Sequence, residues 1–306
     1  MRRYLPIITV LVGFLLVTGW GSRSDALPLK SGDILVTDPA GIISLNPVTG
    51  AHSLFSSVGA SDIDAWGRDI FAIAGNTILR IDPLTGTGTT ISSGGFISNG
   101  VPPRVAVGPG GAVYTLGRIG GFGLLDGVIR INVKDGSQSV VASGLEGGVN
   151  DLSVGPDGKI IVVSETGFWY TVDPITRDVQ HRPGEGDHTK GVDIAADGKV
   201  EIQFRGVDGF SPGGRPLFTP PEDFGEGGII DATWGLYDNL FFSTDLGVFH
   251  IDGPAPSPFG FFYSPISYDV HGRLTAFVPA PAPLLLVLVG LIGLGFFARA
   301  GYCRSK

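Results

Sequence analysis

The sequence predicts an all-β fold of short strands joined by tight turns, and three observations support this expectation. Of the 306 residues, 49 are Gly and 22 are Pro, while 43% are hydrophobic and 16% are charged. This composition favours turns over long helices and still supplies a core. Turns of the Asn/Asp-Pro type recur along the chain, and apolar strands recur about every 40 residues. Such a period of four short strands is typical of a β-propeller blade.

The turn motif is clearest at residues 45–50, 81–86 and 172–176, where Asn or Asp precedes Pro and is followed by Thr. Residues 131–136 form a looser copy. Pro fixes φ at the second position of a turn, and an Asn or Asp side chain caps the backbone that follows it. Each copy therefore predicts a hairpin connection between two strands.

The number of blades follows from the apolar strands that come after the Gly turns. Their first apolar residues are Ile34, Ile70, Val113, Ile160, Val200, Leu240 and Leu274. The first copy, with strands at 33–37, 41–45 and 51–55, lacks an innermost strand, and we expect strand 266–270 to complete it and close the ring. The prediction is a single six-bladed β-propeller over residues 27–278. Seven blades are the alternative, because seven copies of the second strand can be counted.

Residues 1–26 have the features of a secretory signal peptide. Arg2 and Arg3 precede an apolar run from Leu5 to Val17, and a small-x-small pattern ends at Ala26, where we expect cleavage. A helix of that run is roughly 20 Å long, too short for the roughly 30 Å bilayer core. The body is therefore expected to be exported.

Residues 279–306 follow the body with a Pro-rich spacer, an apolar run from Leu284 to Phe297 and a basic end. This order predicts a transmembrane helix whose basic end stays in the cytoplasm while the body lies outside. The segment resembles the PEP-CTERM sorting signal of Gram-negative bacteria that make exopolysaccharide. The residues that match the pattern are Val278, Pro279, Pro281, Arg299 and Arg304, and Ala280 stands where Glu is usual.

The PEP-CTERM resemblance implies a cell address and a partner. An exosortase-type enzyme would process the tail, and the protein would be membrane-inserted before that step and then reside in the envelope or be secreted. A permanent C-terminal membrane anchor is the alternative. The flanking segments hold six of the 21 basic residues and one of the 29 acidic ones, so the body is more acidic than the chain's formal charge of −8. That charge disfavours nucleic acid and leaves polysaccharide or another envelope protein as partners.

The body resembles the NHL and gluconolactonase-like propellers, whose blades carry an Asp-Gly turn between the two inner strands. Here that turn occurs at Asp157-Gly158 and Asp197-Gly198, with weaker versions at 237–240 and 271–274. The resemblance implies an architecture rather than an activity.

An acidic residue stands at the head of five expected inner strands: Asp64, Asp151, Asp193, Asp231 and Asp269. Inner strands line the axial channel of a propeller, so these carboxylates are expected to form a ring that can hold a hard cation such as Ca²⁺. The alternative is structural, with each Asp capping backbone N–H groups and no ion bound.

The gluconolactonase-like resemblance implies that Asn150, next to Asp151, is a ligand of a divalent metal. The chain departs from that family because it has no Glu before Glu146 and carries Lys190 where Asn is usual. No catalytic residue is assigned. The predicted function is an exported non-catalytic scaffold or binding module of the cell surface or exopolysaccharide matrix, and a metal-dependent lactonase-like hydrolase is the alternative. The aromatic residues are interpreted mainly as core, with 259–263 as the better candidate for a sugar platform.

Overall fold

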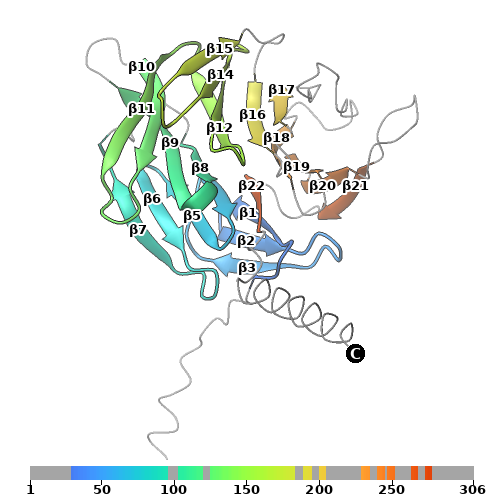
Figure 1. Cartoon of the computed structure of the whole chain (residues 1–306). Helices are drawn as coiled ribbons and strands as arrows, with labels where there is room; N and C mark the ends of the chain where they lie inside the picture. The colour runs from blue at the N-terminus through green and yellow to red at the C-terminus, as the bar shows by residue number, and fades with distance from the viewer. Residues whose placement is uncertain are drawn as a thin grey trace, which may run out of the picture.

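Antiparallel sheets surround a central axis in the computed structural model, which is an all-β propeller (Figure 1). The structure describes residues 29–95, 103–119, 125–182, 189–194, 200–204, 229–234, 240–244, 247–251, 263–267 and 273–277. The innermost strands β4, β8, β12, β16, β18 and β22 contact one another in this order, and β22 lies against β4. The ring is therefore closed.

Five sheets have four strands each and form complete blades, and their strands run from the axis outward in the order in which we give them. Blade 1 is β22 (Leu274–Ala276), β1 (Ile34–Asp38), β2 (Gly41–Leu45) and β3 (His52–Ser56). Blade 2 is β4 (Asp62–Trp66), β5 (Asp69–Ala74), β6 (Thr77–Ile81) and β7 (Gly88–Ser93). Blade 3 is β8 (Val105–Gly108), β9 (Ala112–Ile119), β10 (Leu125–Ile131) and β11 (Gln138–Leu145), with the short 3-10 helix η1 (Pro109–Gly111) between β8 and β9.

Blade 4 is β12 (Val149–Val154), β13 (Ile160–Ser164), β14 (Trp169–Val172) and β15 (Val179–Arg182). Blade 5 is β18 (Ile229–Trp234), β19 (Leu240–Thr244), β20 (Gly247–Ile251) and β21 (Tyr263–Ser267). Between blades 4 and 5, β16 (Thr189–Ile194) and β17 (Val200–Phe204) form a two-stranded sheet that contacts β12 and β18.

The expected blade count is corrected by this topology, because the described residues form five complete blades instead of six or seven. The expected count assumed that every second strand belongs to a complete blade of four strands. The copy that begins at Val200 supplies only two strands within the described residues, and the sequence after it, 205–228, is rich in Gly and Pro. The seventh marker, Leu274, lies in the innermost strand β22 and not in a second strand.

The ring closes as expected, by a C-terminal strand that pairs with the N-terminal three, but through a different strand. Leu274 pairs with Val36 and Ala276 with Ile34, so β22 completes blade 1. The prediction that strand 266–270 closes the ring was wrong. Residues up to Ser267 belong to β21, the outermost strand of blade 5.

The Asn/Asp-Pro turns connect the third and fourth strands, as the motif predicts. Oδ1 of Asn46 accepts hydrogen bonds from the backbone N–H groups two and three residues later, at 2.9 and 3.0 Å. Asp82 and Asp173 accept the same pair of bonds in blades 2 and 4. Side-chain caps therefore fix these connections.

Gly86 shows how such a turn also joins two blades. Its φ is +67°, and an added Cβ would overlap the backbone oxygen of Phe55 in blade 1. The carbonyl of Gly86 accepts a hydrogen bond from the Ser56 hydroxyl. Glycine is therefore required both by the left-handed backbone and by the close approach of the neighbouring outer strand.

The core fills the wedges between neighbouring blades. One cluster between blades 3 and 4 includes Leu116, Val128, Val162 and Tyr170, which are each at most 5% exposed. Similar clusters join blades 1 and 2, blades 2 and 3, and blades 1 and 5. Burial of these apolar faces between sheets stabilises the blade arrangement.

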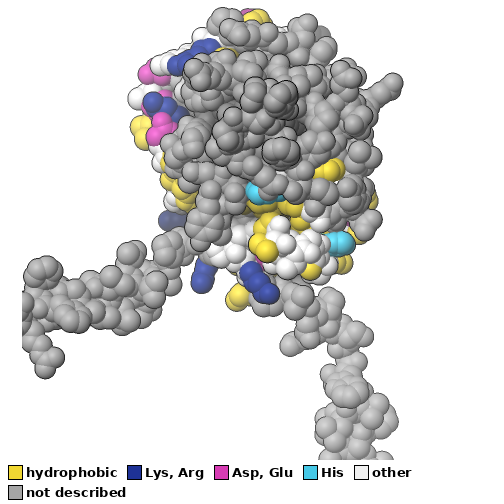
Figure 2. Space-filling model, turned by 90° about the vertical axis from the view of Figure 1, so that its right-hand side faces the viewer, with side chains coloured by type: hydrophobic (Ala, Val, Ile, Leu, Met, Phe, Trp, Pro, Cys, Tyr) yellow, Lys and Arg dark blue, Asp and Glu magenta, His cyan; other side chains and the backbone are white. Residues whose placement is uncertain are grey.

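Both predicted targeting segments lie outside the described residues, as do Asp269 and the aromatic stretch 259–262. Among the residues that the structure describes, no helix is long and apolar enough to cross a bilayer. Figure 2 shows basic and acidic side chains side by side along one edge of the face it presents.

Candidate functional site

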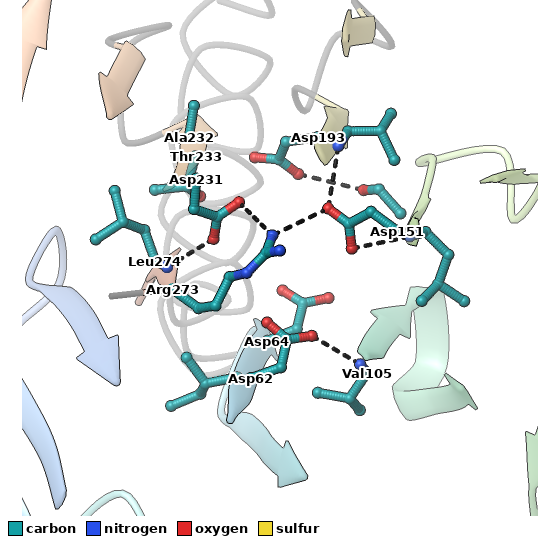
Figure 3. A pocket seen from close by; sticks show the side chains of 14 residues that line it. Asp62, Asp64, Val105, Asp151, Asp193, Asp231, Ala232, Thr233, Arg273 and Leu274 are labelled. Atoms are coloured by element: carbon teal, nitrogen blue, oxygen red, sulfur yellow. Dashed lines mark hydrogen bonds and ion pairs between the residues drawn. The ribbon is translucent and has the colours of Figure 1, made fainter. Parts of the chain in front are cut away.

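The axial channel is the candidate site, because the inner strands bring the acidic residues together there. Figure 3 shows side chains of Asp62, Asp64, Asp151, Asp193 and Asp231 pointing toward the axis with Arg273 among them. The cavity that they line has a volume of about 30 Å³, enough for about two water molecules. The channel is therefore narrow and strongly polar.

In the described part of the channel, carboxylates on β4, β12 and β18 link each of these inner strands to the next one around the ring. Neighbouring inner strands do not pair with each other, so their backbone N–H groups near the axis need other acceptors. An Asp on one strand accepts a hydrogen bond from a backbone N–H of the following strand in four places: Asp62 from Val105 at 2.8 Å, Asp64 from Val107 at 2.7 Å, Asp151 from Val192 at 3.1 Å and Asp231 from Leu274 at 2.8 Å. This is the capping alternative, except that each Asp caps the neighbouring blade.

The acidic residues occupy two levels of the channel instead of one ring. Asp64 pairs with Phe71 on β5, and Asp193 pairs with Glu201 on β17. Each partner comes directly after the first apolar residue of its strand. Asp151 and Asp231 pair two residues deeper, with Val163 on β13 and Ser243 on β19. Asp62 shares that deeper level because it pairs with Ile73.

Two arginines complete the deeper level. Nη1 of Arg273 lies 3.1 Å from Oδ1 of Asp231 and 3.4 Å from Oδ2 of Asp151. Nε of Arg104 lies 3.3 Å from Oδ1 of Asp151. The side chains of both arginines and of Asp151 are at most 11% exposed, so these are buried ion pairs. Each arginine precedes an inner strand, at the position that Asp holds in other blades.

Burial governs the protonation of the channel. It raises the pKa of Asp64 to about 8, although the Val107 and Ala65 amides and the Thr275 hydroxyl oppose this rise. Burial also raises the pKa of Asp62 to about 7, against the attraction of Arg104 and Arg273. Near neutral pH the channel therefore holds fewer negative charges than its number of aspartates.

The same burial raises the pKa of Asp231 to about 6, while Arg273 opposes the rise. The guanidinium of Arg273 is disfavoured by burial, but Asp231, Asp151 and Asp62 together raise its pKa above the ordinary value. Arg273 therefore stays charged at any pH at which the fold exists.

These pKa values predict that the folded protein loses stability as the pH rises. The folded state holds protons on Asp62, Asp64 and Asp231 more tightly than the unfolded state, in which an Asp titrates near 3.8. The free energy of unfolding should therefore fall between pH 5 and pH 8, by at most about 1.4 kcal/mol per pH unit for each group. Urea unfolding at a series of pH values measures this slope.

Two variants test whether the channel aspartates cause this dependence of the unfolding free energy on pH. Asp64→Asn removes one titrating group and should make the pH dependence shallower. Asp82→Asn is the matched control, because Asp82 caps an exposed turn and Asn46 has the same role in blade 1. A stability that rises from pH 5 to pH 8, or equal slopes in the two variants, would contradict the assignment.

The channel carboxylates do not fit a Ca²⁺ ion in this arrangement. Within the described part of the chain, no three His, Cys, Asp or Glu side chains are placed to hold a metal ion. Arg273 lies between Asp151 and Asp231, so a cation there would face a buried guanidinium. Both oxygens of Asp64 already accept hydrogen bonds.

Asn150 and Asp269 are the two remaining predicted metal ligands. Asn150 lies where the pairing of β12 with β13 shifts register, next to Asp151, and it is partly exposed. Asp269 is outside the described residues, and the inner strand of blade 1 carries Arg273 at the level expected for an Asp. Sequence reasoning missed Asp62, Arg104 and Arg273, although each lies at the head of an inner strand.

The aromatic residues that the structure describes belong mainly to the core. Tyr170 is 5% exposed and Phe168 packs against the same cluster. Trp66 and Trp169 pack against other interblade clusters, and the guanidinium of Arg182 lies over the Trp169 ring at 5.3 Å. The interpretation of these residues as core is confirmed.

Comparisons with known proteins support the fold and leave the activity open. No protein-family model matches the chain, and no curated protein matches it. A protein of unknown function from Bacteroides caccae has 11% sequence identity and a TM-score of 0.54, and the match covers 81% of this chain and 99% of that one. This likeness shows a shared β-propeller fold.

Two further solved structures are similar at a lower level. One is a catalytically inactive virginiamycin B lyase from Staphylococcus aureus with quinupristin, at 14% identity and a TM-score of 0.48 over 72% of this chain and 71% of that one. The other is the extracellular domain of a hybrid two-component system from B. thetaiotaomicron, at 11% identity and a TM-score of 0.49 over 71% of this chain. The match spans 30% of that second protein.

Proposed function

We propose that this protein is an exported, non-catalytic β-propeller that acts as a scaffold or binding module of the bacterial cell surface or exopolysaccharide matrix. The observation that carries the proposal is the engagement of the axial carboxylates. Asp62, Asp64, Asp151 and Asp231 accept backbone hydrogen bonds from neighbouring blades, and Arg273 pairs with two of them. Groups engaged in this way hold the ring together and are poorly placed for acid, base or metal chemistry.

The proposed address rests on the sequence of the two ends. A signal peptide over residues 1–26 would export the body, and the PEP-CTERM-like tail would present it to an exosortase-type enzyme in the envelope of a Gram-negative bacterium. The chain ends of the body lie side by side, because Phe277 N donates to Asp33 O at 2.8 Å and Gly32 N donates to Phe277 O at 2.9 Å. Both flanking segments can therefore be removed without cutting a blade.

One preparation of the protein from its own cells tests the address and the absence of activity. Intact-mass measurement should show a chain without residues 1–26 and without the apolar run 284–297, recovered in the envelope or matrix fraction. The same preparation should neither hydrolyse lactones nor gain thermal stability from millimolar Ca²⁺. A site filled at 100 times its dissociation constant would add about 2.7 kcal/mol of stability.

The opposite results have distinct meanings. Retention of residues 284–306 would contradict the sorting step and indicate a permanent membrane anchor. Lactone turnover that is lost in Asn150→Ala and kept in Asn46→Ala would replace the proposal with the metal-dependent hydrolase. Asn46 is a suitable control because it caps an exposed turn on the first blade.

A further inference from the structure

A groove between blades 3 and 4 is a second hollow in the described surface, separate from the axial channel. Its volume is about 230 Å³, below the roughly 300–1,000 Å³ of pockets that hold drug-sized ligands. Its walls are the strand pair β9/β10 on one side and the turns that follow β12 and β14 on the other. A ligand of about one sugar ring matches this size.

An exposed cation lies on the blade 3 wall. Arg130 on β10 is exposed, pairs in register with Tyr114 on β9, and has no carboxylate partner among the described residues. The ring of Tyr114 is buried, and its hydroxyl makes no hydrogen bond within the described part of the chain. Burial raises the pKa of this hydroxyl while the charge of Arg130 opposes the rise, so the hydroxyl keeps its proton near neutral pH. Both residues line the groove.

The blade 4 wall offers hydrogen-bond acceptors around a second cation. Nζ of Lys159 lies 3.8 Å from Oδ2 of Asp157. The backbone N–H groups of Thr176 and Ile175 lower the pKa of Asp173, and the charge of Lys159 adds a smaller effect in the same direction. Asp157 and Asp173 each use Oδ1 to cap their own turns. Oδ2 of Asp173 is therefore left to accept a hydrogen bond from a ligand, and Oδ2 of Asp157 keeps acceptor capacity beside its ion pair with Lys159, whose charge that pair balances.

Apolar side chains complete the lining. Ala112 and Val154 lie at the groove, together with Pro174 and Ile175 from the turn after β14. Ile175 is 90% exposed, so it stands at the rim. C–H faces of a ring can pack on these side chains while polar groups meet the charged walls.

From this arrangement we propose that the groove between blades 3 and 4 binds one acidic sugar unit, a uronate, of a polysaccharide. The carboxylate of the unit pairs with Arg130 and accepts a hydrogen bond from the Tyr114 hydroxyl. Its hydroxyl groups donate to Asp157 and Asp173. The exposed rim at Ile175 lets the polymer continue beyond the groove. The proposal rests on the proposed matrix function, for which it names the ligand.

Blade 2 supplies a matched control for Arg130. Arg80 pairs with Phe71 in the same register in which Arg130 pairs with Tyr114, and Arg80 is also exposed. It differs because its guanidinium contacts Asp69. Arg80→Ala and Arg130→Ala therefore remove the same side chain from equivalent strands, one from a satisfied pair and one from the groove.

The test is calorimetric titration of the full chain with trigalacturonate, and with maltotriose as the neutral probe. The wild-type protein should bind trigalacturonate, and maltotriose at least about tenfold more weakly. Arg130→Ala should weaken trigalacturonate binding by about 10–100-fold, the loss expected for a hydrogen-bonded charge pair. Tyr114→Phe should weaken it less, and Arg80→Ala should leave it unchanged.

Three results would overturn the uronate site. They are no trigalacturonate binding by the wild-type protein, equal binding of both probes, and equal losses in Arg130→Ala and Arg80→Ala. All variants should keep the wild-type unfolding midpoint, because the arginines are exposed and Phe retains the Tyr ring. The mass, fractionation and lactone measurements do not depend on this groove, so failure here is distinguishable from failure of the proposed function.

Discussion

A body that ends at Arg273, and so lacks Leu274–Phe277, is expected to aggregate, whereas a body that ends at Phe277 unfolds cooperatively. The missing strand β22 completes blade 1 and also lies against β18 and β4 on its two sides. Leu274, Ala276 and Phe277 are at most 7% exposed. Their removal opens the ring and leaves the hydrogen-bonding edge of β1 without a partner.

The measurements for this truncation are sedimentation velocity and urea unfolding of residues 27–273 and 27–277. The longer body is the matched control, since both lack the C-terminal segment and differ by four residues. We expect a monomer with one unfolding transition for the control and large aggregates for the shorter body. A soluble, monomeric and cooperatively unfolding 27–273 body would show that β22 is not needed for closure.

Replacing Arg273 by Met is the second change for which we expect a large loss. Met has a similar length and no charge, so Asp151 and Asp231 would remain buried without the guanidinium that contacts both. Breaking a buried ion pair by removing one partner costs about 3–5 kcal/mol. The variant should therefore have a much lower free energy of unfolding than the wild-type protein at pH 7.

Arg80→Met is the control for the charge effect. Arg80 contacts Asp69, but its side chain is 55% exposed, and exposed pairs contribute about 0–1 kcal/mol. Urea unfolding at pH 7 compares the two variants. Equal losses would contradict a special role of the channel, whereas a loss confined to Arg273→Met supports it. The loss should shrink at pH 5, where more of the channel aspartates are protonated.

Local turn chemistry made most of the fold predictable from the sequence. Asn46 and Asp82 cap their turns through the same two backbone N–H groups, so a repeated motif corresponds to a repeated connection. The apolar strands that begin near Ile70 and Ile160 occur where they were expected. These features depend on residues within a few positions of each other, which a single sequence displays directly.

The arrangement of the channel depends on register and on distant contacts, which local patterns do not reveal. Asp151 pairs with Val163 on β13 whereas Asp64 pairs with Phe71 on β5, so Asp151 lies at the deeper level although both residues stand near the head of an inner strand. Arg273 meets Asp151 across 122 positions of sequence. Nothing near Arg273 in the sequence identifies that partner. A count of second strands alone also could not show how many strands each blade contains.

The pairing of β22 with β1, which closes the ring, affects the order of folding. Ile34 and Ala276 pair across about 240 residues of chain, and contacts of such long sequence separation form slowly because the loop must close first. We therefore expect the ring to assemble blade by blade and to close last. Contacts that form after the rate-limiting step control the rate of unfolding and hardly affect the rate of folding. The rate at which the native ring opens is then controlled by the pairing of Leu274–Ala276, the shortest strand among the described residues.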